Sequence, residues 1–280
     1  MTLSELYLHP ESVVVIAHRG FAGRFPENTT GAIAEGVKLG VDVIEFDLRA
    51  SKDHVAVAMH DPTLDRTTDG NGDVGDHTLA ELKELNASFW TGGHFDGRRL
   101  DEPACDDLSI PTCRECLDVI PPDVGVFLHV NQVDDFKMVE EVCGLYDEYE
   151  LDGRACMIVN TFDDGRLIRR IDDRIDLCIL EDRDDIGLEA MERRKAVGSR
   201  FLIATVAAVD EAHCRALKES GLLFGMFYSN TDADNRRFIA MGMKGIVTDY
   251  PDILIKTRRD IGRNAHDSSR YSCGPTTRSD

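Results

Sequence analysis

The chain has 280 residues, a length that suits one large domain with a single hydrophobic core. Its 52 acidic residues against 32 basic ones give a net charge of −20, which argues against nucleic-acid binding, because there is no basic stripe to neutralise phosphates. No apolar run approaches the length of a membrane span. Residues 1–10 lack the basic start and apolar core of a signal peptide, so we expect a cytoplasmic protein.

Apolar strand candidates alternate with helical patterns along most of the chain. The strand candidates lie at 13–17, 42–48, 125–130, 156–160, 175–180, 201–206, 222–228 and 245–248, with an additional one at 55–59. The helical patterns lie at 30–39, 136–149, 163–171, 185–197, 210–220 and 232–241. This alternation predicts a parallel sheet and favours one α/β barrel over two separate domains.

The strand candidate at 42–48 carries Glu45 and Asp47, which point to the same face because side chains alternate along a strand. The link at 51–54 is too short for a parallel crossover, so we expect an antiparallel hairpin with 55–59. Pairing residue 50 with residue 55 would set Glu45 opposite His60. A charged outer face on an edge hairpin would explain the acids, but it would not explain a histidine opposite them.

Polar clusters follow three of the short apolar runs. His18 and Arg19 follow the first run, Glu45 and Asp47 lie within the second, and His60 follows the third. Two imidazoles, two carboxylates and a guanidinium are the groups needed to bind a divalent metal and split a phosphoester.

Several short motifs surround these residues. They are His18-Arg19-Gly20, Pro26-Glu27-Asn28-Thr29, Glu45-x-Asp47, Met59-His60-Asp61-Pro62, Leu64-Asp65-Arg66-Thr67-Thr68, Thr78-Leu79-Ala80-Glu81-Leu82, Ile110-Pro111-Thr112 and Gly245-Ile246-Val247-Thr248-Asp249-Tyr250-Pro251. In this order they resemble the signature of the glycerophosphodiester phosphodiesterase family. The resemblance covers about residues 13–255.

The resemblance implies a TIM-like (β/α)8 barrel with an extra hairpin strand and a site at the carboxyl ends of its strands. It also implies that a small phosphodiester substrate is hydrolysed to glycerol phosphate and an alcohol with a divalent cation, Mg²⁺ or Ca²⁺, which suits carboxylate ligands. By position, His18 and His60 match the general acid/base pair. Arg19 matches the phosphate-binding arginine. Glu45 and Asp47 match two metal ligands.

The strand candidate at 125–130 departs from the family pattern of a glutamate followed two residues later by a lysine. His129 and Asn131 stand at these positions. In one interpretation His129 is a third metal ligand and shifts the preference toward Mn²⁺, Co²⁺ or Zn²⁺. In the other, the site has lost a metal ligand and a phosphate-binding cation, and the barrel binds a phosphorylated ligand without turnover.

Residues 61–110 form a polar insertion with one helical stretch at 79–85. We expect Phe89 and Trp90 to cap the barrel mouth, and a lysophospholipase D-type enzyme would need an apolar groove near Phe89, Trp90 and Phe95. Phe227 stands where the family often carries a tryptophan, so it is expected to form the floor of a glycerol pocket.

Four other polar residues have structural interpretations beside functional ones. Asn28 or Thr29 is expected to cap the helix at 30–39, and Glu27 to support the site from behind. Asp249 ends the last strand, where it would serve either the site or a cap.

The strong acidic excess suggests adaptation to high salt, because molar salt shortens the Debye length to about 3 Å and removes self-repulsion. The cysteines lack zinc-finger spacing and are expected to be reduced, mostly buried residues. We expect residues 1–257 to form the barrel and residues 258–280 to form a polar, mobile tail.

Overall fold

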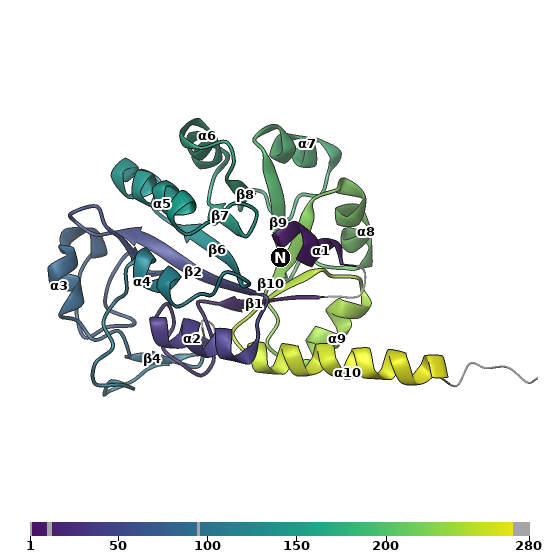
Figure 1. Ribbon diagram of the computed structural model, residues 1–280, viewed down its shortest axis with the longest axis horizontal. Coiled ribbons are helices and arrows are strands. Elements are labelled where there is room, and N and C mark those ends of the chain that lie inside the picture. Colours follow the sequence, from purple (N-terminus) through teal and green to yellow (C-terminus); the bar gives the residue numbers. More distant parts are fainter. Residues whose placement is uncertain (1, 10–12, 94–95, 271–280) are drawn as a thin grey trace, which may run out of the picture.

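The computed structural model describes residues 2–9, 13–93 and 96–270, with side chains through residue 262. Eight parallel strands close into a barrel (Figure 1). The first strand of the ring pairs with both the second and the last, which closes it. In ring order the strands are β1 (Val14–His18), β2 (Val43–Ala50), β6 (Gly125–Val130), β7 (Ala155–Val159), β8 (Asp176–Ile179), β9 (Ser199–Thr205), β10 (Leu223–Phe227) and β11 (Gly245–Thr248). The predicted TIM-like barrel is confirmed.

Helices surround the ring and pack their apolar faces against its outer side (Figure 1). Side-chain caps of Thr or Asp begin most of them, as the sequence pattern predicts. These helices are α2 (Thr30–Leu39), α4 (Cys113–Asp118), α5 (Phe136–Glu148), α6 (Phe162–Ile171), α7 (Leu188–Ala196), α8 (Glu211–Ser220), α9 (Asp232–Ala240) and α10 (Pro251–Arg270).

A separate cluster of buried side chains fills the inside of the ring. Phe127 and Phe201 meet there edge to face, with ring centroids 5.6 Å apart. The short helix α1 (Leu3–Leu8), which the sequence reading did not predict, inserts Leu3 and Tyr7 into the same cluster. A Cβ on Gly125, the first residue of β6, would meet the Leu3 side chain at 2.7 Å, so α1 closes the barrel at the amino ends of the strands.

The strand β3 (Ala56–Ala58) lies outside the ring and pairs antiparallel with β2, so the predicted hairpin is confirmed. Its register differs by one residue from the expected one, because Leu48 pairs with Ala58 and Ala50 with Ala56. The expected pairing of residue 45 with residue 60 is therefore wrong. The reason lies in the turn, where His54 adopts a left-handed conformation with φ 67° and adds one residue to the loop.

The insertion at 61–110 builds a small core of its own beside the barrel. It contains a 3₁₀ turn, η1 (Val74–Asp76), the helix α3 (Leu79–Lys83) and a short hairpin of β4 (Trp90–Thr91) and β5 (Arg98–Arg99). Trp90 packs against the guanidinium of Arg66, and Phe89 against that of Arg99. Both aromatic rings are engaged within the insertion, and neither lines the pocket at the barrel mouth, so the lining of that pocket gives the expected aromatic cap no support.

The predicted tail from residue 258 is also wrong for its first part, because α10 continues to Arg270. Arg258 forms an ion pair with Asp42 and donates a hydrogen bond to the Val13 carbonyl at 2.9 Å, which fixes the helix to the barrel. Residues 271–280 of the expected tail lie outside the described residues. Within the described ranges, no helix is both long and apolar enough to cross a membrane.

Candidate functional site

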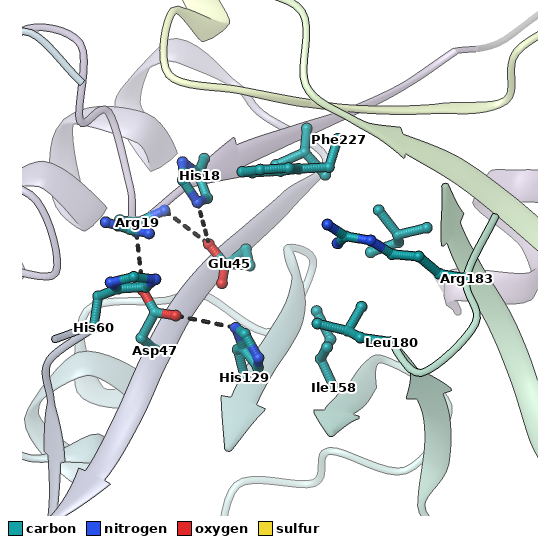
Figure 2. A pocket seen from close by; sticks show the side chains of 12 residues that line it. His18, Arg19, Glu45, Asp47, His60, His129, Ile158, Leu180, Arg183 and Phe227 are labelled. Carbon is teal, nitrogen blue, oxygen red and sulfur yellow. Dashed lines mark hydrogen bonds and ion pairs between the residues drawn. The ribbon is translucent and has the colours of Figure 1, made fainter. Parts of the chain in front are cut away.

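A pocket lies at the carboxyl ends of the barrel strands (Figure 2). All the site residues predicted from the sequence line it: His18, Arg19, Glu45, Asp47, His60, His129 and Phe227. The rest of its wall is mostly apolar and consists of Ile158, Leu180, Arg183, Ile203 and Val247. The pocket therefore has an ionisable side and an apolar side.

The backbone after β1 turns sharply and couples the first two strands. Arg19 adopts φ 54° and Gly20 φ 77°, and a Cβ on Gly20 would lie 2.6 Å from the backbone of Ala32 in α2. Only glycine fits at this close approach. The turn directs the backbone N–H of Arg19 to the Glu45 carboxylate at 3.0 Å, which fixes Glu45 against the end of β1.

The side chains of Glu45, Asp47 and His129 each present one ligand atom within 4.8 Å of the others. Asp47 and His129 are register neighbours on β2 and β6, and His129 Nδ1 lies 3.1 Å from Asp47 Oδ1. Two cis ligands at about 2.1 Å from one cation lie roughly 3 Å apart, so this spacing fits shared coordination. Carboxylate oxygens with an imidazole nitrogen suit a divalent cation such as Mn²⁺, Co²⁺ or Zn²⁺.

The second nitrogen of His129 also fits a ligand role. His129 Nε2 lies 3.3 Å from Asn160 Oδ1, and an amide oxygen can only accept a hydrogen bond. A cation bound between His129 and Asp47 would select the tautomer in which Nε2 carries the proton and Nδ1 keeps its lone pair for the metal. A metal-bound histidine commonly donates its other N–H in this way.

The Asp47 carboxylate is surrounded by donors. Asn28 and Asn131 donate to its two oxygens at 3.0 and 3.1 Å, and Arg19 Nε lies 2.9 Å away. Burial raises the pKa of Asp47, but the charge of Arg19 and the contact with His129 outweigh it and hold the pKa well below its usual value. Asn131 therefore contacts a carboxylate at the position where the family pattern has a lysine.

Glu45 has the opposite electrostatic situation. Burial and the neighbouring charge of Asp47 raise the pKa of Glu45 well above its usual value, against the opposing charge and N–H of Arg19. Two adjacent buried carboxylates that resist joint ionisation are a favourable place for a cation, because its charge replaces the proton.

Arg19 is held in a fixed orientation from two sides. It is only 2% exposed, and its Nη1 donates to Glu27 at 2.6 Å while its Nε faces Asp47. Burial opposes its charge, yet Asp47 and Glu27 raise the pKa of Arg19 above its usual value. Glu27 also accepts from Arg66 at 2.7 Å, so the expectation that Glu27 supports the site from behind agrees with its contacts.

Each pocket histidine has a carboxylate at its Nδ1. His18 Nδ1 lies 2.7 Å from Asp249, and His60 Nδ1 lies 2.7 Å from Asp61. Burial raises the pKa of Asp249, but its hydrogen bond and charge interaction with His18 lower the pKa to about 2. Burial likewise raises the pKa of Asp61, and contacts with His60 and Arg66 bring it below its usual value. Ionised carboxylates only accept hydrogen bonds, so the neutral forms of His18 and His60 carry their proton on Nδ1 and a lone pair on Nε2.

Several contacts in the site were not assigned from the sequence. The sequence allows Asp249 a role either in the site or as a cap, and in the structure its carboxylate contacts His18. Asn28 was a candidate cap, but Thr29 caps α2 and Asn28, at φ 55°, bonds Asp47. The strand-end position of Asp249 was a signal for its role, whereas Arg183 lies in a loop without any sequence signal.

Comparison with known proteins agrees with the geometry. Residues 18–253 match the glycerophosphoryl diester phosphodiesterase family. A glycerophosphodiester phosphodiesterase of Bacillus subtilis (strain 168) is 29% identical over 265 residues, covering 90% of this chain and 88% of the relative. One from Caldanaerobacter subterraneus subsp. tengcongensis is 30% identical over 256 residues, covering 89% and 99%.

A solved structure has the same fold. It is a phosphodiesterase of Oleispira antarctica in complex with the product sn-glycerol-3-phosphate, with a TM-score of 0.73, 23% identity and coverage of 87% of this chain and 96% of that one. The match to the family over most of the chain is the decisive finding. The chain therefore belongs to the glycerophosphoryl diester phosphodiesterase family and is a phosphoric diester hydrolase.

Proposed function

We propose that this protein hydrolyses a glycerophosphodiester to glycerol phosphate and an alcohol, with a divalent cation held by Glu45, Asp47 and His129. The observation that carries the proposal is the convergence of this ligand group with His18 and His60 in one pocket. The product named in the Oleispira antarctica complex, sn-glycerol-3-phosphate, supports the same substrate class.

The cation, when bound, would polarise the phosphate and stabilise the charge that develops on its oxygens. Arg19, fixed by its two carboxylate partners, would add positive charge beside the phosphate. One of His18 and His60, in its neutral form, would accept the proton of the nucleophile at Nε2, and the other, as an imidazolium, would give its Nε2 proton to the leaving alkoxide.

The carboxylates behind the histidines contribute to both transfers. Asp249 and Asp61 would keep a proton on Nδ1 of each imidazole, so that Nε2 is the atom that exchanges a proton with the substrate, and would stabilise the imidazolium form. His60, whose side chain is 31% exposed, is in contact with solvent, whereas His18 is buried. Phe227 packs edge-on against His18 with ring centroids 5.0 Å apart, and would form an apolar surface for the glycerol carbons.

A barrel that binds a phosphorylated ligand without turnover is the second candidate. It is favoured by Asn131, an uncharged residue where the family pattern has a lysine. Phe89 and Trp90 do not line the pocket and so give the lysophospholipase D-type alternative no support, while Phe95 lies outside the described residues.

The test is a metal add-back assay on purified protein stripped of metal. Glycerophosphodiester turnover is measured with Mg²⁺, Ca²⁺, Mn²⁺, Co²⁺ and Zn²⁺ added singly, at low salt and in molar KCl, because the charge of −20 predicts better activity in high salt. We expect at least one ion to restore turnover in the wild type and none to restore it in Glu45→Gln. Folded protein that turns over no glycerophosphodiester with any of these ions would favour the barrel that binds a phosphorylated ligand without turnover.

The cellular setting is a separate proposal. The cysteines in the described part of the chain are free and, except for Cys105, buried, which fits a reducing cytoplasm.

A further inference from the structure

We propose that Arg183 is a substrate-binding residue that selects diesters with a neutral or anionic alcohol over diesters with a cationic head-group. This inference rests on the proposed function, since it names the substrate class of the same pocket. Arg183 comes from the loop between β8 and α7 and lines the pocket (Figure 2).

The position of Arg183 is defined by the turn that carries it. Its backbone N–H donates to the Leu180 carbonyl at 3.1 Å, and the preceding residue, Asp182, adopts φ 52°. Figure 2 shows the guanidinium reaching from this turn into the pocket, between Phe227 and Leu180 and across from Arg19. Its central carbon lies 5.9 Å from the centroid of the Phe227 ring, within the range of a cation–π contact.

The acids next to Arg183 in the chain have other partners. Asp182 pairs with Arg193 at 2.7 Å, and Asp184 accepts hydrogen bonds from the backbone and hydroxyl of Thr205 at 2.7 and 2.6 Å. Within the ranges that the structure describes, Arg183 forms no ion pair with a carboxylate. Arg19, the other arginine of the pocket wall, is in contrast paired with Glu27 and Asp47. The positive charge of Arg183 is therefore available to a ligand.

The charge balance of the pocket gives this arginine a role. Glu45 and Asp47 are matched by a divalent cation, and Glu27 and Asp61 match Arg19 and Arg66, so a monoanionic diester still needs a counter-charge. The position of the family's lysine holds Asn131, whose amide donates to Asp47. Arg183 supplies a cation from the opposite wall, and a guanidinium binds phosphate oxygens through paired N–H groups.

The same geometry acts against a cationic head-group. A quaternary ammonium is usually bound on an aromatic face, but the guanidinium of Arg183 lies at the Phe227 ring. Among the residues that the structure describes, the apolar side of the pocket, with Ile158, Leu180 and Ile203, includes no carboxylate to balance a second cation. Choline and ethanolamine diesters would meet like charge, whereas diesters of glycerol or inositol would not.

The experiment compares kcat/KM for glycerophosphoglycerol and glycerophosphocholine in the wild type and three variants. Arg183→Gln removes the charge, Arg183→Lys keeps it, and Arg215→Gln is the control, because it removes an exposed arginine that pairs with Glu211 in α8, outside the pocket. We expect the wild type to prefer glycerophosphoglycerol and Arg183→Gln to lower this preference about tenfold, because the substitution removes the like-charge repulsion of the choline group. Arg183→Lys should retain most of the preference, and the control all of it.

An unchanged ratio in Arg183→Gln, an equal fall in Arg215→Gln, or a wild type that prefers the choline diester would each overturn the inference. Turnover of either diester by the wild type supports the proposed function whatever the ratio. If neither is turned over, the proposed function fails, and calorimetric affinities for the same two diesters decide on Arg183 by the same ratio.

Discussion

The contact between His18 and Asp249 gives the sharpest test of the site. Asp249→Asn is close to isosteric, and its outcome depends on Asn230. The side-chain oxygen of Asn230 accepts from the backbone N–H of residue 249 at 2.9 Å and from the Thr248 hydroxyl at 3.1 Å. This arrangement fixes the Asn230 NH2 group toward Asp249 Oδ2, at 3.0 Å.

The new amide has two orientations, and both are unfavourable. With its NH2 group at the Oδ2 position, two donors would face each other 3.0 Å apart, at a cost of about 1–3 kcal/mol. With its NH2 group toward His18, it would donate to Nδ1 and shift the His18 proton to Nε2. His18 would then lose the lone pair through which it takes up a proton.

Loss of a general acid or base usually costs about 10²–10⁴ in rate, so we expect kcat to fall by that factor, or roughly 3–5 kcal/mol of activation free energy. The assay is steady-state hydrolysis of a glycerophosphodiester with saturating cation, beside thermal unfolding to establish that the variant folds. Asp252→Asn is the control, since Asp252 is an acid of the same segment that pairs with Arg24 outside the pocket. A kcat for Asp249→Asn within about threefold of the wild type would refute the reasoning.

Three further predictions follow from other contacts. His129→Glu should shift the preferred ion toward Mg²⁺ or Ca²⁺, and His129→Ala should weaken the binding of every ion. Calorimetric titration measures both effects, and an unchanged ion preference in both variants would exclude His129 as a ligand. Tyr7→Phe should leave the free energy of unfolding unchanged or raise it, because the buried Tyr7 hydroxyl has no hydrogen-bond partner among the described residues. Tyr7→Ala should lower the free energy of unfolding by about 3 kcal/mol. Urea unfolding of both variants checks this, and a strongly destabilised Tyr7→Phe would contradict it. The folded-state pKa of Asp249 is about 2 against an ordinary value of 3.8, so its ionised form should contribute roughly 2 kcal/mol of stability above pH 3.8, and this contribution is lost as the pH falls through about 2. The difference in unfolding free energy between wild type and Asp249→Asn should therefore narrow over this pH range, and a constant difference would argue against the shift.

Much of the barrel was predictable because its signals are local. Apolar runs and capped helices give the alternation of strand and helix directly, and the period of two along a strand places Glu45 and Asp47 on one face. The adjacency of Asp47 and His129 then follows from parallel pairing of β2 with β6. The pocket brings together residues that sequence motifs had already marked.

The features that were missed depend on tertiary contacts or on single backbone angles. The hairpin register follows from the left-handed conformation of His54, which sequence periodicity does not reveal. The partnership of His18 with Asp249 joins residues 231 positions apart and exists only once β1 pairs with β11. The extension of α10 depends on the contact of Arg258 with the barrel, while composition alone favoured a mobile tail.

The most direct measurement for the account as a whole is to follow the phosphorus chemistry. A glycerophosphodiester is incubated with wild-type protein and the preferred cation, and ³¹P NMR records whether the diester resonance is replaced by that of glycerol phosphate. The account predicts a phosphomonoester with the wild type and cation, and none with a chelator or with Glu45→Gln. Monoester formation that persists with the chelator, or its absence with every cation in folded protein, would contradict metal-dependent hydrolysis at this site.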